Sequence, residues 1–271
     1  MLRAVDGILP KVWALGNVTD AHAAFLPAFD HGITVGDGVF ETAKIVRGRP
    51  FALRRHLERL SRSAAGLGLP SPDVTEVRAA IDEVIGANAL GETTGGVLRI
   101  TYTAGPGPLG SGRPAELCPS LVVAAAGARP WGPTASVQIV PWTRNERGAL
   151  AGLKTTSYGE NVVALASAHR SGADEAIFAN TRGELCEGTG TNVFVGIAGR
   201  LVTPPLSSGC LDGVTRALVV ELGGIDEDVL PIDSLRTADE AFLTSSTREV
   251  HPIATVDGPV SYTHLRAHET G

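Results

Sequence analysis

Several features that assign a protein to a broad class are missing from this 271-residue sequence. No apolar stretch reaches the roughly 20 residues that a helix needs to cross a bilayer, and the first residues lack the apolar core of a secretory signal. The net charge is −6, and no run of basic residues is present that would bind nucleic acid. We therefore expect a cytoplasmic protein with neither a membrane nor a nucleic acid as its partner.

Cysteine is scarce as well. Cys118, Cys186 and Cys210 are odd in number and lack the spacing of a metal site, so we expect reduced thiols and no bound metal. A hydrophobic fraction of 43% is still enough for a substantial core. The length fits two domains or one large domain, because domains average about 150 residues. The sequence contains no internal repeat or low-complexity segment.

The first half of the chain alternates predicted strands and helices. Partial apolar–polar alternation predicts a strand at 40–46, which the turn at 47–50 joins to 50–53 in a hairpin. Asp73 and Glu76 have capping-box spacing ahead of an apolar stripe, which predicts a helix. In this half we expect strands at 12–15, 40–46, 96–103 and 120–124, and helices at 55–66 and 74–85.

Two irregular segments interrupt this pattern. The Gly/Pro-rich loop at 104–114 has a length that is uncommon inside a domain unless the loop is functional. The segment 127–133 resembles an inter-domain connection. We therefore predict an N-terminal domain at 1–126, a linker at 127–133 and a C-terminal domain at 134–258. In that domain we expect strands at 137–140, 175–179, 184–186, 192–195, 200–202 and 241–243, and helices at 161–171 and 214–222.

Lysine is limited to three positions, because arginine supplies nearly all of the positive charge. Lys11 and Lys44 lack cofactor-like surroundings, whereas Lys154 lies among small polar residues in the segment GLKTTSYGEN. A lysine amine has a pKa near 10.4 and is a poor nucleophile at neutral pH unless burial or a nearby cation lowers that pKa. The segment suits the lysine of a pyridoxal-phosphate enzyme, and it also suits an exposed loop.

Other parts of such a site have candidates further along the chain. Glu187 precedes a Gly/Thr run, and a carboxylate there could face the pyridine nitrogen of the cofactor or simply end a turn. A phosphate needs backbone amides at a helix N-terminus and a fixed cation. The segments 211–216 and 245–247 and the side chain of Arg54 are candidates for these tasks, although each is weak evidence alone.

Together these stretches resemble the class IV pyridoxal-phosphate enzymes, the fold-type IV group of branched-chain aminotransferases, D-amino-acid aminotransferases and aminodeoxychorismate lyases. The resemblance runs from FDHGITVGDGVFET at 29–42 to 251–253 and includes EGTGTNVF at 187–194. It implies an α+β or α/β fold like that of D-amino-acid aminotransferase. Its two domains would be a smaller N-terminal α/β domain and a larger C-terminal pseudo-barrel that binds pyridoxal 5'-phosphate.

The resemblance also implies roles for particular residues. Lys154 would form the Schiff base and shuttle protons, and Glu187 would face the pyridine nitrogen. Tyr158 falls near the place of an aminotransferase tyrosine, although it is one residue closer to the lysine. The remaining candidates would hold the phosphate, and they are Arg54, Val214, Thr215 and Ser246.

Substrate-facing positions favour the lyase, which converts aminodeoxychorismate to 4-aminobenzoate and pyruvate through a quinonoid in folate synthesis. Ile33 replaces a tyrosine of the D-amino-acid enzymes, and the arginine and histidine that they carry near Tyr102 and Ala104 are absent. The Gly-Asp-Gly at 36–38 differs from branched-chain aminotransferases, and 173–176 resembles the lyases. An aminotransferase for branched-chain or D-amino acids is the alternative, and a non-catalytic protein that binds pyridoxal phosphate is a third.

The substrate carboxylate has no assigned partner, because the arginine of the lyases near Tyr102 is also missing. Arg99, Arg113 and Arg144 stay open as substitutes. The resemblance further implies a homodimer in which the neighbour's loop, here 104–114, closes the pocket. The tail at 259–271 matches nothing in the family and is expected to be an artefact of sequencing-adaptor read-through, so its His264 and His268 are not a metal site.

Overall fold

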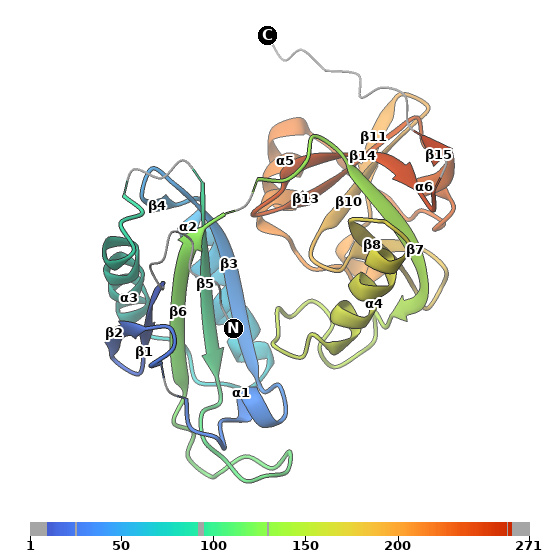
Figure 1. Ribbon diagram of the computed structural model, residues 1–271. Coiled ribbons are helices and arrows are strands. Elements are labelled where there is room, and N and C mark those ends of the chain that lie inside the picture. The colour runs from blue at the N-terminus through green and yellow to red at the C-terminus, as the bar shows by residue number, and fades with distance from the viewer. Residues whose placement is uncertain (1–9, 25, 92–94, 129, 259, 262–271) are drawn as a thin grey trace. The chain divides into compact units, whose positions relative to one another are not determined.

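A computed structural model describes residues 10–24, 26–91, 95–128, 130–258 and 260–261. The chain divides into two compact units (Figure 1). Unit 1 takes the described residues up to Pro130 together with Leu153–Ser157, and unit 2 takes Trp131–Gly152 and the described residues from Tyr158 on. Residues 153–157 were predicted to belong to the C-terminal domain. The predicted boundaries of the two domains and the linker stay a prediction.

Unit 1 is built on a six-stranded sheet in which every strand pair is antiparallel. This unit is therefore α+β rather than α/β. The strands follow the order β2-β1-β6-β5-β3-β4. Their bounds are β1 Lys11–Ala14, β2 Asn17–Asp20, β3 Gly38–Val46, β4 Arg49–Pro50, β5 Gly96–Thr103 and β6 Ser120–Gly127.

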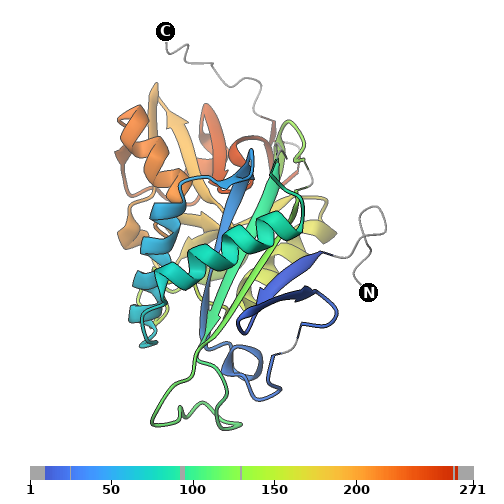
Figure 2. The same ribbon diagram turned by 90° about the vertical axis from the view of Figure 1, so that its left-hand side faces the viewer.

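Two long helices complete the core of unit 1, and Figure 2 shows α3 lying diagonally across the sheet. In α2 (Leu53–Gly66), the side chains of Leu57, Leu60 and Ala64 recur at helical spacing and are buried. Helix α3 (Val74–Ala87) starts at Asp73, whose carboxylate accepts the amides of Thr75 and Glu76. The predicted N-cap is thereby confirmed. A short α1 (His31–Thr34) precedes β3.

Unit 2 contains a nine-stranded mixed sheet with the order β12-β11-β10-β13-β14-β7-β8-β9, and β15 pairs with β14. The pairs β14–β7, β7–β8 and β11–β12 are parallel. The strands are β7 Ala135–Arg144, β8 Glu175–Asn180, β9 Leu185–Gly188, β10 Asn192–Ile197, β11 Arg200–Thr203, β12 Asp226–Glu227, β13 Glu240–Ser245, β14 Glu249–Val256 and β15 Val260–Ser261. The helices are α4 Gly159–Arg170, the 3₁₀ turn η1 Leu206–Ser208, α5 Val214–Gly223 and α6 Ser234–Thr237.

The predicted strands and helices are all present, but several elements were not predicted. The longest is β14, where Pro252 and the polar Glu249 and His251 hide the strand pattern. The other unpredicted elements are the short β2, α1, η1, β12, α6 and β15. Strand β15, which pairs with β14, consists of residues 260–261 of the segment predicted as a tail. Residues 262–271, with His264 and His268, lie outside the described residues.

All three cysteines are free. Burial raises the pKa of the Cys186 thiol and raises that of Cys210 to about 11, so both stay protonated near neutral pH. Within the described part of the chain, no helix is long and apolar enough to cross a membrane.

Candidate active site

The backbone around Lys154 is bonded to unit 1 on both sides. The amide of Phe40 donates to the Lys154 carbonyl over 3.0 Å, and the Thr156 amide donates to the Gly38 carbonyl over 2.8 Å. Together with the bridge between Val39 and Thr155, these bonds dock the segment against the start of β3. The Lys154 amide donates to the hydroxyl of Ser63 in α2, 3.2 Å away. Lys154 therefore has a fixed backbone although it lies outside the regular strands and helices.

The Lys154 amine lies over an aromatic ring that also carries a second cation. Its Nζ is 4.3 Å from the centre of the Phe40 ring, and the guanidinium carbon of Arg99 is 3.3 Å from the same centre. Attraction to the ring holds both cations in place. A neighbouring cation is one of the features that activate a lysine amine as a nucleophile.

Close packing with α2 fixes the residue before the lysine. A Cβ on Gly66, the last residue of α2, would lie 2.6 Å from Cδ2 of Leu153. The absence of a side chain at Gly66 therefore makes room for the Leu153 side chain.

A buried ionic cluster joins α2 to β3 close to this segment. Glu41 accepts hydrogen bonds from Arg59 Nε at Oε1 and from Arg59 Nη2 at Oε2 over 2.7 and 2.8 Å, and His56 Nδ1 lies 2.7 Å from the same Oε2. Burial opposes the ionisation of Glu41, but the bonds from Arg59 and His56 prevail and lower its pKa from 4.5 to about 2. The cluster supports the strand that carries Phe40.

In unit 2, the Glu187 carboxylate is held at both oxygens. Arg144 Nε donates to Oε1 over 3.1 Å, and the Leu211 amide donates to Oε2 over 2.8 Å. The Arg144 guanidinium in turn stacks on the Phe178 ring, 4.1 Å from its centre. Glu187 is thus anchored to the loop that leads into α5. Such a fixed, partly buried carboxylate suits a partner for a ring nitrogen.

The start of α5 suits an anion. Gly213 is the N-cap of α5, and it has no side chain that could cap the helix. The amides of Val214 and Thr215, in the first turn, therefore point out of the helix end toward a possible anion. A Cβ on Gly213 would lie 2.0 Å from Oδ1 of Asn192, so a side chain there would push the Asn192 amide aside. Thr244 lies opposite Asn192 in the sheet, and its buried Oγ1 has no hydrogen-bond partner within the described structure. These features fit the phosphate of the predicted cofactor.

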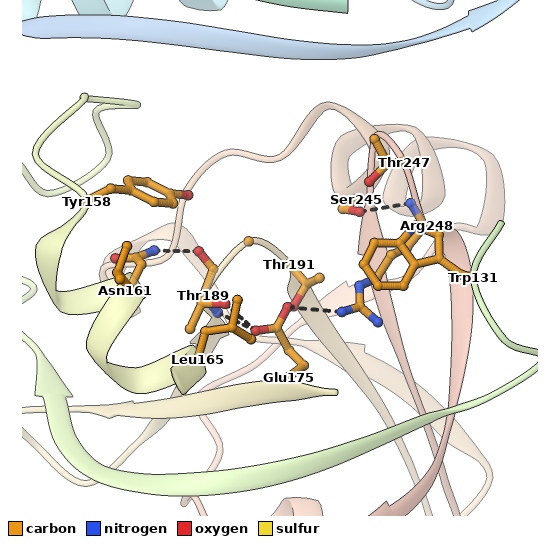
Figure 3. A pocket seen from close by; sticks show the side chains of 12 residues that line it. Trp131, Tyr158, Asn161, Leu165, Glu175, Thr189, Thr191, Ser245, Thr247 and Arg248 are labelled. Carbon is orange, nitrogen blue, oxygen red and sulfur yellow. Dashed lines mark hydrogen bonds and ion pairs between the residues drawn. The ribbon is translucent and has the colours of Figure 1, made fainter. Parts of the chain in front are cut away.

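Tyr158 and the neighbours of Ser246 line one pocket of about 240 Å³ in unit 2 (Figure 3). Tyr158 is the N-cap of α4, and Ser246 lies in the turn between β13 and β14. Ser245 and Thr247, on either side of Ser246, are lining residues. The structure therefore brings these two predicted segments together.

Arg54 is the predicted site residue with the weakest local support. It lies in the first turn of α2 in unit 1, its side chain is 75% exposed, and it pairs with Glu58 over 2.9 Å. Its assignment to the phosphate stays a prediction. The same holds for the roles of Lys154, Glu187, Tyr158, Val214, Thr215 and Ser246.

The three arginines considered for a substrate carboxylate differ in their surroundings. Arg113 grips Asp37 through Nε and Nη2 over 2.7 and 2.6 Å and also donates to the carbonyls of Leu67 and Gly68. Arg144 is engaged with Glu187. Arg99 is the arginine of the three that contacts the same Phe40 ring as the Lys154 amine.

Several pocket residues were not predicted as site residues. The segments 173–176 and 187–192 were singled out as family-like, but their patterns did not reveal which side chains bond to one another. Asn161, in the first turn of α4, carried no signal beyond its place at the start of a predicted helix. These lining residues are Trp131, Asn161, Glu175, Thr189, Thr191 and Arg248.

Known proteins are similar to this chain over most of its length. The family model described as "Amino-transferase class IV" matches residues 38–256. A Methanocaldococcus jannaschii protein with a provisional branched-chain-amino-acid aminotransferase name is 33% identical, covering 92% of this chain and 89% of that protein. The aminodeoxychorismate lyase of Bacillus subtilis is 29% identical, covering 91% and 86%.

Solved structures are similar over nearly the whole chain. The branched-chain aminotransferase of Thermoproteus uzoniensis is 30% identical with a TM-score of 0.84, covering 94% of this chain and 90% of that one. A hypothetical aminotransferase from Mycobacterium tuberculosis in its PLP-bound form is 27% identical with a TM-score of 0.81, covering 94% and 93%.

Proposed function

Because the chain belongs to the class IV aminotransferase family, whose members depend on pyridoxal phosphate, we propose that it is an aminotransferase that holds the carboxylate of an amino acid with Arg99. The observation that carries this proposal is the Phe40 ring, which the Lys154 amine and the Arg99 guanidinium share. An amino acid carries its amino group and its carboxylate on the same carbon, so a group that binds the carboxylate must lie near the lysine. A guanidinium that contacts the same ring as the lysine amine is suited to that carboxylate.

When bound, pyridoxal phosphate supplies an electron sink for the carbon that bears the substrate nitrogen. In our proposal Lys154 binds the cofactor through its amine and then moves a proton at that carbon. Glu187 keeps the ring nitrogen protonated, and Arg144 and the Leu211 amide hold its carboxylate in place for that task. The phosphate would be bound by Val214, Thr215, Ser246 and Arg54, and Tyr158 would lie by the cofactor oxygen.

The substrate class follows from the relatives and is part of the proposal. Branched-chain aminotransferases recur among them, and the enzyme from Escherichia coli K12 is 28% identical over 91% of this chain. We expect the purified protein to transfer the amino group of a branched-chain amino acid to a 2-oxo acid. Arg99→Ala should raise KM for the amino acid about 10- to 100-fold, the equivalent of one lost charged hydrogen bond.

Steady-state kinetics with L-valine, L-leucine and D-alanine test this proposal, with Arg99→Lys as the conservative variant and Arg147→Ala as an exposed-arginine control. An unchanged KM in Arg99→Ala would refute the assignment of Arg99 to the substrate carboxylate. If the wild-type protein binds the cofactor but acts on none of these amino acids, the proposed aminotransferase activity is wrong.

Aminodeoxychorismate lyase is the second proposal and stays a hypothesis. It is supported by the Bacillus subtilis relative and by the Gly-Asp-Gly at 36–38. Asp37 of that segment accepts a hydrogen bond from Arg113 in the loop at 104–114. Formation of 4-aminobenzoate and pyruvate from aminodeoxychorismate, lost in Lys154→Ala, would establish it. The homodimer, the role in folate synthesis and the cytoplasmic location stay predictions.

A further inference from the structure

Glu175 is a buried carboxylate in unit 2 that none of the roles above uses. It begins β8, is 2% exposed, and lies beneath the turn between β9 and β10. Its Oε1 accepts the amide of Thr189 over 3.1 Å and also the Thr189 hydroxyl, and its Oε2 accepts the Thr191 hydroxyl over 3.3 Å. One side chain therefore fixes both threonines of the turn, as Figure 3 shows.

The turn is tightly closed over this carboxylate. A Cβ on Gly188 would lie 2.1 Å from Oγ1 of Thr191 and 3.2 Å from the Glu175 carboxyl carbon. The amide of Gly188 donates to the Thr191 carbonyl over 2.8 Å. Because the turn has no spare space, a change in the Glu175 bonds must move the turn itself.

A line of side chains leads from the turn to Glu187. Asn161 of α4 donates from Nδ2 to the Thr189 carbonyl and accepts at Oδ1 from Arg144 Nη1 over 2.9 Å. Arg144 Nε then donates to Glu187 Oε1. The two carboxylates, Glu175 and Glu187, are thus joined through Thr189, Asn161 and Arg144. Each of these side chains is buried or partly buried, so water competes little for the bonds.

The far side of Glu175 is closed by Arg248. Its Nη2 lies 3.8 Å from Glu175 Oε2 and donates to the Asp174 carbonyl over 3.0 Å. The guanidinium carbon is 3.7 Å from the centre of the Trp131 ring, and the Arg248 amide donates to the Ser245 hydroxyl over 3.0 Å. Glu175 is therefore ion-paired with an arginine whose backbone amide bonds to the turn that contains Ser246.

We propose that Glu175 is a positioning residue for Glu187, acting through the Thr189 turn, Asn161 and Arg144. This inference rests on the role of Glu187 under the proposed function. Glu175 does not touch the reacting atoms; it sets where the Glu187 carboxylate points. A glutamine in its place is uncharged and carries an NH₂ donor at one end. Turned toward Thr189, that NH₂ would face the amides of Thr189 and Ala176, which can only donate. Turned toward Thr191, it would require the hydroxyl to rotate and accept, and the remaining bonds would be weaker than those to a carboxylate. The turn would then move, and Asn161 and Arg144 would move with it.

Hydrogen exchange at the Leu211 amide reports on this chain of contacts from Glu175 to Glu187, here called the relay, and it can be measured without any cofactor. This amide donates to Glu187 Oε2, lies far from Glu175 in the sequence, and shares no hydrogen bond with it. In Glu175→Gln we expect hydrogen exchange at Leu211 to be about tenfold faster than in the wild type, because its acceptor is held less firmly. In the holoenzyme we expect kcat to fall about tenfold with KM nearly unchanged. We also expect the apparent pKa of the lysine–cofactor absorbance to rise, because a less protonated ring withdraws less charge.

Asp174→Asn is the matched control. Asp174 is the adjacent carboxylate and likewise accepts a backbone amide and a hydroxyl, but both belong to Ser136 rather than to the Thr189 turn. It should leave Leu211 exchange and the absorbance unchanged. Thr189→Val, which removes one donor to Glu175 and keeps the shape, should act like Glu175→Gln in smaller measure and serves where Glu175→Gln fails to fold. Glu175→Gln combined with Asn161→Leu should be no worse than the more severe single variant, because both interrupt one relay.

The outcomes separate this inference from the proposed function. Faster exchange at Thr189 and Thr191 with wild-type exchange at Leu211, in both Glu175→Gln and Thr189→Val, would overturn the relay. So would full additivity of the double variant. If Leu211 responds but the wild type acts on no amino acid, the relay stands and the proposed function fails. If the wild type is active and the Glu175 variants match Asp174→Asn in kcat and absorbance, Glu175 is structural only.

Discussion

At the scale of the residue, the surroundings of Lys154 make a direct prediction. Its backbone is bonded to β3 and α2, and its amine lies on the Phe40 ring. Lys154→Ala removes the amine without removing those backbone bonds, so the fold should persist while the activity falls at least about 10³-fold. Activity assays, together with mass analysis of the peptide labelled after borohydride reduction, measure this. Label on Lys11 or Lys44 would refute the assignment.

The Glu41 carboxylate gives a second prediction, on stability and pH. Its folded pKa, about 2, is lowered from 4.5, so its contribution is complete above about pH 4.5 and is lost as the pH falls toward 2. The shift corresponds to about 3 kcal/mol. Glu41→Gln also leaves Arg59 buried without its carboxylate, which costs about 3–5 kcal/mol at pH 7.

We therefore expect the gap between wild type and Glu41→Gln in unfolding free energy to be largest near pH 7 and to shrink below pH 4.5. Urea melts across this range measure it. Glu58→Gln, on the exposed face of the same helix, is the control and should change stability by less than about 1 kcal/mol. A gap that stays constant down to pH 3 would show that the Glu41 cluster contributes no charge-dependent stability.

At the scale of the element, the loop at 104–114 is fastened at its base and open at its tip. Arg113 bonds Asp37 and the carbonyls that end α2, and His31 Nε2 lies 2.8 Å from the Pro108 carbonyl. Gly105 has φ +78°, and a Cβ there would lie 1.7 Å from the Cys118 carbonyl oxygen. The tip residue Leu109 is 74% exposed.

Arg113→Ala should loosen the attachment of the loop at 104–114 to Asp37 and to the carbonyls of Leu67 and Gly68. Hydrogen exchange at the amides of Ala104 and Gly107, which donate to Asp37 and Phe29, should become about tenfold faster or more. Arg147→Ala, an exposed arginine in unit 2, provides the comparison. Unchanged exchange in Arg113→Ala would mean that the loop is held by its glycines and His31 alone.

At the scale of the whole molecule, exposed apolar side chains in unit 1 support the proposed homodimer. Phe29, Ile33 and Leu109 are 55%, 61% and 74% exposed, and the Gly107 amide of the loop donates to the Phe29 carbonyl. Large exposed apolar side chains are suited to an interface. Light scattering should give a mass near twice the 28.0 kDa of the chain. Leu109→Asp should shift the equilibrium toward the monomer, since it places a charge at the proposed contact. A fully active monomer would contradict the proposal.

Local pattern was enough for much of the secondary structure. The apolar stripes of α2 and α3 and the cap at Asp73 lie within short windows, where helical spacing determines which side chains are buried. Local pattern did not predict β14, because Pro252 and the polar residues before it do not form a strand pattern. The segment becomes a strand because it pairs with β13 on one side and β7 on the other. The antiparallel order of unit 1 also depends on pairings between distant strands, which spacing along the chain does not encode.

By itself the sequence determined the family, because the scarce lysine and the motif after Glu187 are chemically specific and occur in a fixed order. The same pattern predicts which residues form the site. Tertiary structure alone decided the contacts among them. Arg99 and Lys154 meet on Phe40 because β5 pairs with β3 and the lysine segment docks beside it. Glu175 reaches Glu187 through Thr189, Asn161 and Arg144 because strands and a helix from separate stretches converge on one turn. Hydrogen bonds depend on distance and direction in space, and neither is written in the order of residues.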